Sequence, residues 1–277
     1  MSMAARLALA ALTGEAVIAT RIALVGGGAA GIGHAAAAHL LRQGLGVVLA
    51  GRHADTLATA ADKLRADSTG PVDTLVHDVS RLSDVDAAQA VQHVEETLGS
   101  LDVLVLNAGG PPPGGILEVT DEQWLRSYEL LLLGPLRLAR AALPAMAVRG
   151  FGRVVLVTSA AVRQPQPDLA ISVVLRSAAT AAAKLLSREY AANGVTVNCV
   201  APGATATDRR AEVLAARAAS VGSSVEEMAA LDTLDVPASR PATADEIGAA
   251  VAFLASRAAS YVNGTVLTVD GGRTETI

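Results

Sequence analysis

The sequence predicts an α/β fold: a single-domain, doubly wound sheet of about seven parallel strands with helices on both faces. Short apolar runs rich in Val, Leu and Ile alternate with longer amphipathic stretches, and glycine-rich segments follow several of the apolar runs. Helices cover both sides of a parallel sheet, so its strands are continuously apolar rather than alternating. No linker or composition break divides the 277 residues, which indicates one domain.

The expected strands are the apolar runs at 22–25, 47–50, 72–76, 103–106, 154–158, 195–200 and 266–269. The expected helices lie between them, where Ala, Leu, Glu and Arg recur with helical periodicity. They span 31–43, 54–66, 83–98, 121–149, 170–193 and 244–256. Residues 1–20 form an N-terminal extension, and 21–277 form the domain. Within it, extra helical material at 208–240 is expected to be a lid over the carboxyl edge of the sheet, where ligands bind in such folds.

Composition and charge exclude several classes of protein. The formal net charge is −5, which excludes a strongly basic nucleic-acid binder, and the 51% hydrophobic content is too high for a disordered chain. No run of eighteen apolar residues is free of charges and turn signals, so no membrane span is expected. The start of the chain lacks a signal-peptide cleavage pattern, and the single cysteine, Cys199, excludes an internal disulfide. A cytoplasmic location is therefore expected.

A glycine-rich loop follows the first expected strand and opens directly into a helix; residues 26–33 read GGGAAGIG. Gly27 allows a tight turn, Gly31 allows a pyrophosphate to approach closely, and Gly33 allows the helix to pack against the strand. The free N–H groups at the helix N-terminus favour phosphate. Because the loop lies between a strand and a helix at the start of an alternating fold, it predicts a Rossmann dinucleotide site rather than a merely tight turn.

Further motifs follow in order: Asp78-Val79 after the third expected strand, Asn107-Ala108-Gly109 after the fourth, Thr158-Ser159 after the fifth, Pro202-Gly203 after the sixth and Asp270-Gly271-Gly272 at the end. With the G-x-x-x-G-I-G loop, these motifs resemble the short-chain dehydrogenase/reductase family. They are most similar to its single-domain members that resemble 3-oxoacyl-carrier-protein reductases. The resemblance covers about residues 21–273.

The resemblance implies cofactor-binding roles at the matching positions. Gly27, Gly31, Ile32 and Gly33 would hold the pyrophosphate, Asp78 and Val79 would border the adenine, Asn107, Ala108 and Gly109 would line the adenine ribose, and Pro202, Gly203, Thr205 and Thr207 would flank the nicotinamide.

The residue that follows the second strand decides between NADP(H) and NAD(H). Enzymes that use NAD usually place a carboxylate there, whereas this chain has Gly51-Arg52. An arginine can meet a 2′-phosphate bidentately, so NADP(H) is favoured over NAD(H). Two alternatives stay open: Arg52 is a solvated surface residue, or it stacks on the adenine. Asp55, a turn later, would soften the preference.

Three of the family's four catalytic positions are changed. The family serine is Ser159, but thirteen residues later Ser172 replaces the tyrosine that protonates the substrate oxygen. Arg176 replaces the lysine that lowers the tyrosine pKa and holds the nicotinamide ribose. Leu131, seven residues after Trp124, replaces the relay asparagine. We therefore predict Ser159, Ser172 and Arg176 as the catalytic residues, with Arg176 also contacting the cofactor.

A proline follows the altered asparagine position. Pro135 has no N–H to donate to the carbonyl of Leu131, four residues earlier. In the family, the carbonyl of the asparagine is thought to hold a relay water, so we hypothesise that Pro135 preserves that water site. None of the three tyrosines occupies the family's phenol position, and the five histidines show no metal-ligand spacing.

Three functions are compatible with these residues. The favoured one is an NAD(P)(H)-dependent oxidoreductase that reduces a carbonyl, a conjugated enone or a related small molecule with an atypical proton donor. Dienoyl-CoA reductases also carry serine in place of the family tyrosine, although they keep the lysine. The alternatives are a non-catalytic NADP(H)-binding protein, acting as a sensor or an inactive oligomer partner, and a non-redox isomerase or cyclase. The resemblance also implies a homodimer or homotetramer formed through the fourth and fifth helices.

Overall fold

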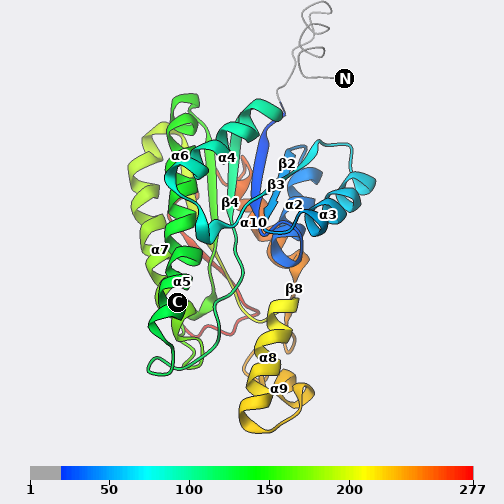
Figure 1. The fold of residues 1–277 in the computed structure, drawn as a ribbon, viewed down its shortest axis with the longest axis vertical. Helices are drawn as coiled ribbons and strands as arrows, with labels where there is room; N and C mark the ends of the chain where they lie inside the picture. The colour runs from blue at the N-terminus through cyan, green and yellow to red at the C-terminus, as the bar shows by residue number, and fades with distance from the viewer. Residues whose placement is uncertain (1–19, 277) are drawn as a thin grey trace, which may run out of the picture.

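The computed structural model describes residues 20–276, and its centre is a seven-stranded parallel sheet (Figure 1). The strand order is β3-β2-β1-β4-β5-β6-β9, and all strands are parallel. The chain adds β2 and β3 on one side of β1 and then crosses to add β4 on the other side. The strands are β1 (Ile22–Gly26), β2 (Gly46–Gly51), β3 (Val72–Val76), β4 (Leu101–Leu106), β5 (Gly152–Val157), β6 (Val195–Pro202) and β9 (Val266–Val269). The predicted doubly wound fold is confirmed, and every expected strand is found within two residues at either end.

Helices cover both faces of the sheet and build two aliphatic cores. One face carries α2 (Gly31–Arg42), α3 (Ala54–Asp67) and α10 (Ala244–Ala255), and the other carries α4 (Asp84–Thr97), α6 (Gly134–Arg149) and α7 (Ala170–Tyr190). Small side chains let these helices approach closely. A Cβ on Gly248 in α10 would lie 2.7 Å from the carbonyl carbon of Ala35 in α2. The abundance of alanine in the sequence thus serves close helix packing.

The stretch expected as one helix over 121–149 is divided in three. It consists of α5 (Asp121–Tyr128), a π-helical turn η2 (Glu129–Leu133) and α6. The N–H of Gly134 donates to the carbonyl of Glu129, five residues earlier. Pro135 has no N–H, so neither the carbonyl four residues before it nor the one five residues before it receives a bond from this position. The helix therefore opens where Pro135 was expected to disturb it, while the relay water itself remains a hypothesis.

Two stretches, Asp121–Arg149 and Ala170–Asn193, are long and apolar enough to cross a membrane by length and composition alone. In the structure, α6 contacts β4 and β5, and α7 contacts β6, so both stretches belong to one helical layer of the domain. Val148, Val174 and Leu185 on these helices remain exposed. The exposed apolar side chains lie on the helices that the sequence predicts as the oligomer contact.

The extra helical material expected at 208–240 is present as α8 (Asp208–Val221) and α9 (Val225–Leu231). These helices project from the body of the domain in Figure 1. A short parallel pair, β7 (Thr205–Ala206) and β8 (Ala242–Thr243), holds the two ends of the segment together. The N-terminal extension expected at 1–20 lies outside the described residues except for Thr20.

Candidate active site

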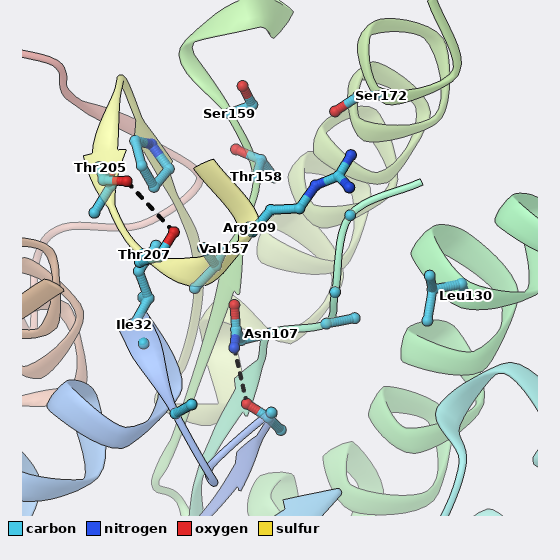
Figure 2. A pocket seen from close by; sticks show the side chains of 18 of the residues that line it. Ile32, Asn107, Leu130, Val157, Thr158, Ser159, Ser172, Thr205, Thr207 and Arg209 are labelled. Carbon is cyan, nitrogen blue, oxygen red and sulfur yellow. Dashed lines mark hydrogen bonds between the residues drawn. The ribbon is translucent and has the colours of Figure 1, made fainter. Parts of the chain in front are cut away.

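A cavity of about 640 Å³ opens at the carboxyl end of the sheet and extends under α8. Every predicted cofactor residue except Gly33 lines it, and so do the predicted catalytic residues Ser159, Ser172 and Arg176. Figure 2 shows Ile32, Asn107, Ser159, Ser172, Thr205 and Thr207 around this space. The sequence motifs, which are far apart along the chain, therefore meet in one place.

The glycine loop forms a tight cradle whose members have different tasks. Gly27 has φ +59°, and a Cβ there would lie 2.7 Å from Nδ2 of Asn107, which donates to the carbonyl of Gly26 at 3.0 Å. A Cβ on Gly33 would lie 2.2 Å from the carbonyl oxygen of Gly27. Gly33 thus allows α2 to pack on the loop, as its position predicts. It does not itself line the cavity, so its predicted contact with the cofactor stays a prediction.

Arg52 and Asp78 line the cavity beside β2 and β3, where the sequence predicts that the adenosine binds. Oδ1 of Asp78 accepts from the N–H of Ser80 at 3.0 Å and from its hydroxyl at 2.7 Å. Burial would raise the pKa of Asp78, but these hydrogen bonds and the charge of Arg52 outweigh it and lower the pKa. Arg52 is exposed and forms no hydrogen bond or ion pair within the described part of the chain. Its guanidinium is therefore available to bind a phosphate, such as the 2′-phosphate that distinguishes NADP(H) from NAD(H).

At the other end of the cavity, Arg176 holds Ser172 in place. Its Nε donates to Oγ of Ser172 at 3.3 Å, and its Nη1 donates to the carbonyl of Val157 at 2.7 Å. Burial, together with the nearby charge of Arg209, lowers the pKa of Arg176 to about 10. Arg176 therefore stays protonated at neutral pH. Ser159 lines the same space, and its Oγ accepts from the N–H of Ala161 at 3.2 Å.

The relay position and the tyrosines offer no titrating acid. The Leu131 side chain packs against Ile171 and Leu175, while its neighbour Leu130 lines the cavity. All three tyrosines are within the described residues, and none of them lines the cavity. The site therefore combines hydroxyl donors and a permanent cation without a phenol.

The lid contributes side chains that the sequence motifs did not identify. Arg217 on α8 pairs with Asp168 at 2.6 Å, pairs with Asp232 at 2.9 Å and donates to Gln166 at 3.1 Å. Arg210 also pairs with Asp232, at 2.9 Å. Through its pair with Arg217, Asp168 ties the loop before α7 to α8.

Arg209 reaches into the cavity from the start of α8. Its Nη2 donates to the carbonyl of Pro111 in the loop after β4, and its Nη1 pairs with the exposed Glu212 at 3.2 Å. In Figure 2 its side chain extends across the pocket toward the side that carries Ser172. One sequence signal could have identified Arg209. Arg209 and Arg210 lie in the first turn of α8, where positive charge is unfavourable to the helix dipole, which suggests a role outside helix stability.

The sheet, the switch point between β1 and β4 and the glycine cradle define a Rossmann-type dinucleotide-binding protein. Comparison with known proteins identifies the family. The family model described as enoyl-(acyl carrier protein) reductase matches residues 27–274. The chain belongs to the short-chain dehydrogenase/reductase family and resembles the 3-oxoacyl-carrier-protein reductases.

Relatives and solved structures match nearly the whole chain. FabG, the 3-oxoacyl-[acyl-carrier-protein] reductase of Haemophilus influenzae, is 32% identical over 91% of this chain and 97% of its own length. The uncharacterized oxidoreductase YvrD of Bacillus subtilis is 31% identical over 91% of this chain and 95% of its own. An actinorhodin polyketide ketoreductase solved with NADPH has a TM-score of 0.88 at 33% identity and covers 93% of this chain and 98% of its own.

Proposed function

We propose that the protein is an NADP(H)-dependent reductase of a small carbonyl or conjugated enone compound, and that its proton donor is water rather than a phenol. The observation that carries this proposal is one cavity that joins an intact dinucleotide cradle to Ser159, Ser172 and Arg176. The preference for NADP(H) rests on Arg52, which lines the cavity and has no partner in the part of the chain that the structure describes. Several similar structures were solved with NADPH or NADP, which also supports this preference.

The side chains of the site can stabilise negative charge on a substrate oxygen. When bound, the nicotinamide supplies the hydride. The two serine hydroxyls and the Arg176 guanidinium can donate hydrogen bonds to the oxygen on which negative charge develops. A serine hydroxyl is a far weaker acid than a phenol, whose pKa is about 10, and Arg176 keeps its proton at neutral pH. These groups therefore stabilise an oxyanion without giving up a proton.

This arrangement favours an enone over an isolated ketone. Addition of hydride to the β-carbon of an enone leaves an enolate, whose negative oxygen the three donors can hold. Water then protonates the α-carbon and leaves as hydroxide, so the chain need not supply the proton. A simple alkoxide needs its proton on the oxygen at once, and neither the two serine hydroxyls nor the Arg176 guanidinium gives up a proton readily at neutral pH.

The test is cofactor binding followed by turnover on a substrate panel. We expect NADPH to raise the melting temperature more than NADH does, and the purified protein to oxidise NADPH faster with conjugated enones than with matched saturated ketones. The absorbance of NADPH measures the rate. Binding of NADPH without turnover across the panel would support a non-catalytic binding protein. Conversion of a substrate without net NADPH consumption would support an isomerase or cyclase.

We also propose that the protein is a homo-oligomer, held together through the helical layer of α5, α6 and α7. The exposed apolar side chains of Val148, Val174 and Leu185 support this contact. Light scattering after size-exclusion chromatography is expected to show a dimer or tetramer. Leu185→Arg would lower the measured mass, whereas Val221→Arg on the lid would not, and a wild-type monomer would contradict the proposal. The cytoplasmic location remains a prediction.

A further inference from the structure

The cavity contains a cation, Arg176, that has no carboxylate partner among residues 20–276. Three other arginines that line it have carboxylate partners: Arg210 and Arg217 pair with Asp232, and Arg273 pairs with Asp235 at 2.9 Å. Arg176 is different, because it donates to the hydroxyl of Ser172 and the carbonyl of Val157, which carry no charge. Its pKa is perturbed by burial and by a second cation, Arg209. An uncompensated buried charge is costly, so an anionic ligand at this point would be strongly favoured.

Arg209 strengthens this positive region. Its carboxylate partner, Glu212, lies three residues along the same helix with a side chain that is 68% exposed. An exposed pair of this kind stabilises little, since water screens it. The rest of the Arg209 side chain is close enough to Gly110 that a Cβ there would lie 2.2 Å from its Nε. The guanidinium is therefore held over the loop after β4, beside the cavity.

The phosphates of a dinucleotide do not explain Arg176. The glycine cradle that would hold the pyrophosphate follows β1, whereas Arg176 is bonded to Val157 at the end of β5. Two strand spacings separate β1 from β5 in the sheet order, which is about 10 Å. The nicotinamide near this end is positively charged when oxidised, so it cannot compensate the arginine either. The missing negative charge belongs to the substrate.

We propose that the substrate is a small conjugated enone that also carries a carboxylate, and that this carboxylate binds between the guanidinium groups of Arg176 and Arg209. Leu130, Leu169 and Val213 line the same cavity and offer an apolar surface to the remainder of the molecule. The proposal rests on the proposed reductase function and adds the chemical class of its substrate. It also gives the substituted lysine position a task, because an arginine fork matches a carboxylate better than an ammonium does.

The experiment uses a carboxylate that cannot be reduced, 3-phenylpropionate, and its neutral amide as the matched probe. Calorimetry measures the Kd of both, with the free protein and with its NADPH complex. We expect the acid to bind at least tenfold more tightly than the amide, since hydrogen bonds to charged groups contribute more than neutral ones. Arg209→Gln and Arg176→Gln should each remove about tenfold of this preference, while Arg209→Lys keeps part of it.

Controls separate this inference from the reductase function. Arg126→Gln, at an exposed position on α5, should leave both probe affinities unchanged. Because Arg176→Gln can disturb folding, Arg209→Gln at the partly exposed start of the lid carries the test. Equal binding of acid and amide would overturn the proposal, as would an Arg209→Gln variant that loses NADPH affinity and keeps the acid preference. If uncharged enones are reduced as fast as enones that carry a carboxylate, the reductase function stands and the carboxylate site does not.

Discussion

Arg52→Ala is expected to weaken NADPH binding by about 10- to 100-fold and to leave NADH binding nearly unchanged. The range follows from losing a charge-assisted contact to one phosphate, a loss of roughly 1.5–3 kcal/mol. Arg52 is available for that contact because it is exposed, lines the cavity and has no partner among residues 20–276. Fluorescence titration of the two reduced cofactors gives both dissociation constants.

Arg42→Ala is the matched control for this prediction. Arg42, at the end of α2, has a side chain that is 61% exposed, and it does not line the cavity. Its removal should change neither dissociation constant by more than about twofold. Equal losses for NADPH and NADH in Arg52→Ala would instead mean that the arginine stacks on the adenine, which both cofactors share.

The second large effect is expected from restoring the family's acid. Ser172→Tyr combined with Arg176→Lys should raise kcat/KM for a simple ketone by about 100-fold, the lower end of what a positioned general acid contributes. The single variants should gain much less, because the phenol and the ammonium act as a unit. The ratio of ketone to enone activity distinguishes a restored acid from a general change in the pocket.

The pH dependence of the rate should differ between the wild type and the double variant. In the wild type, Arg176 has a pKa of about 10 and keeps its charge near neutral pH. Its ionisation should therefore leave the reduction rate nearly constant between about pH 6 and 9. In the double variant, reduction needs the protonated phenol. Its rate should fall as pH rises through the tyrosine pKa. If the double variant gains no ketone reductase activity at any pH, other differences in the pocket, such as the buried Leu131 and the lid, also prevent the reaction.

The fold could be predicted from sequence because its signals are local. The strands read as continuous apolar runs, and the glycine loop lies between β1 and α2. The π-helical turn at Glu129–Leu133 was only indicated by Pro135, since its extent depends on how the helix packs. There a Cβ on Gly134 would lie 2.0 Å from the carbonyl of Val79, which requires the helix and the loop after β3 to be in place together.

The site was predicted where a motif marks it and missed where only distance in space does. Ser159, Ser172 and Arg176 were found by counting along the chain, and all three line the cavity. Arg209 and the Arg217–Asp168 pair could not be found that way. They join residues 49 or more positions apart in sequence, and no local pattern encodes which carboxylate an arginine on a lid will meet.

Gly33 and Gly109 are glycines for different physical reasons. Gly33 is required by packing alone, so a descendant that had lost the cofactor would still have to keep it. Gly109 has nothing within 4 Å of an added Cβ, and its backbone does not demand glycine. A side chain there would harm only whatever occupies the cavity. Among related sequences, replacement of the glycine at position 109 would therefore indicate that the cavity has lost its ligand, whereas a conserved glycine at position 33 would not indicate that the ligand is kept.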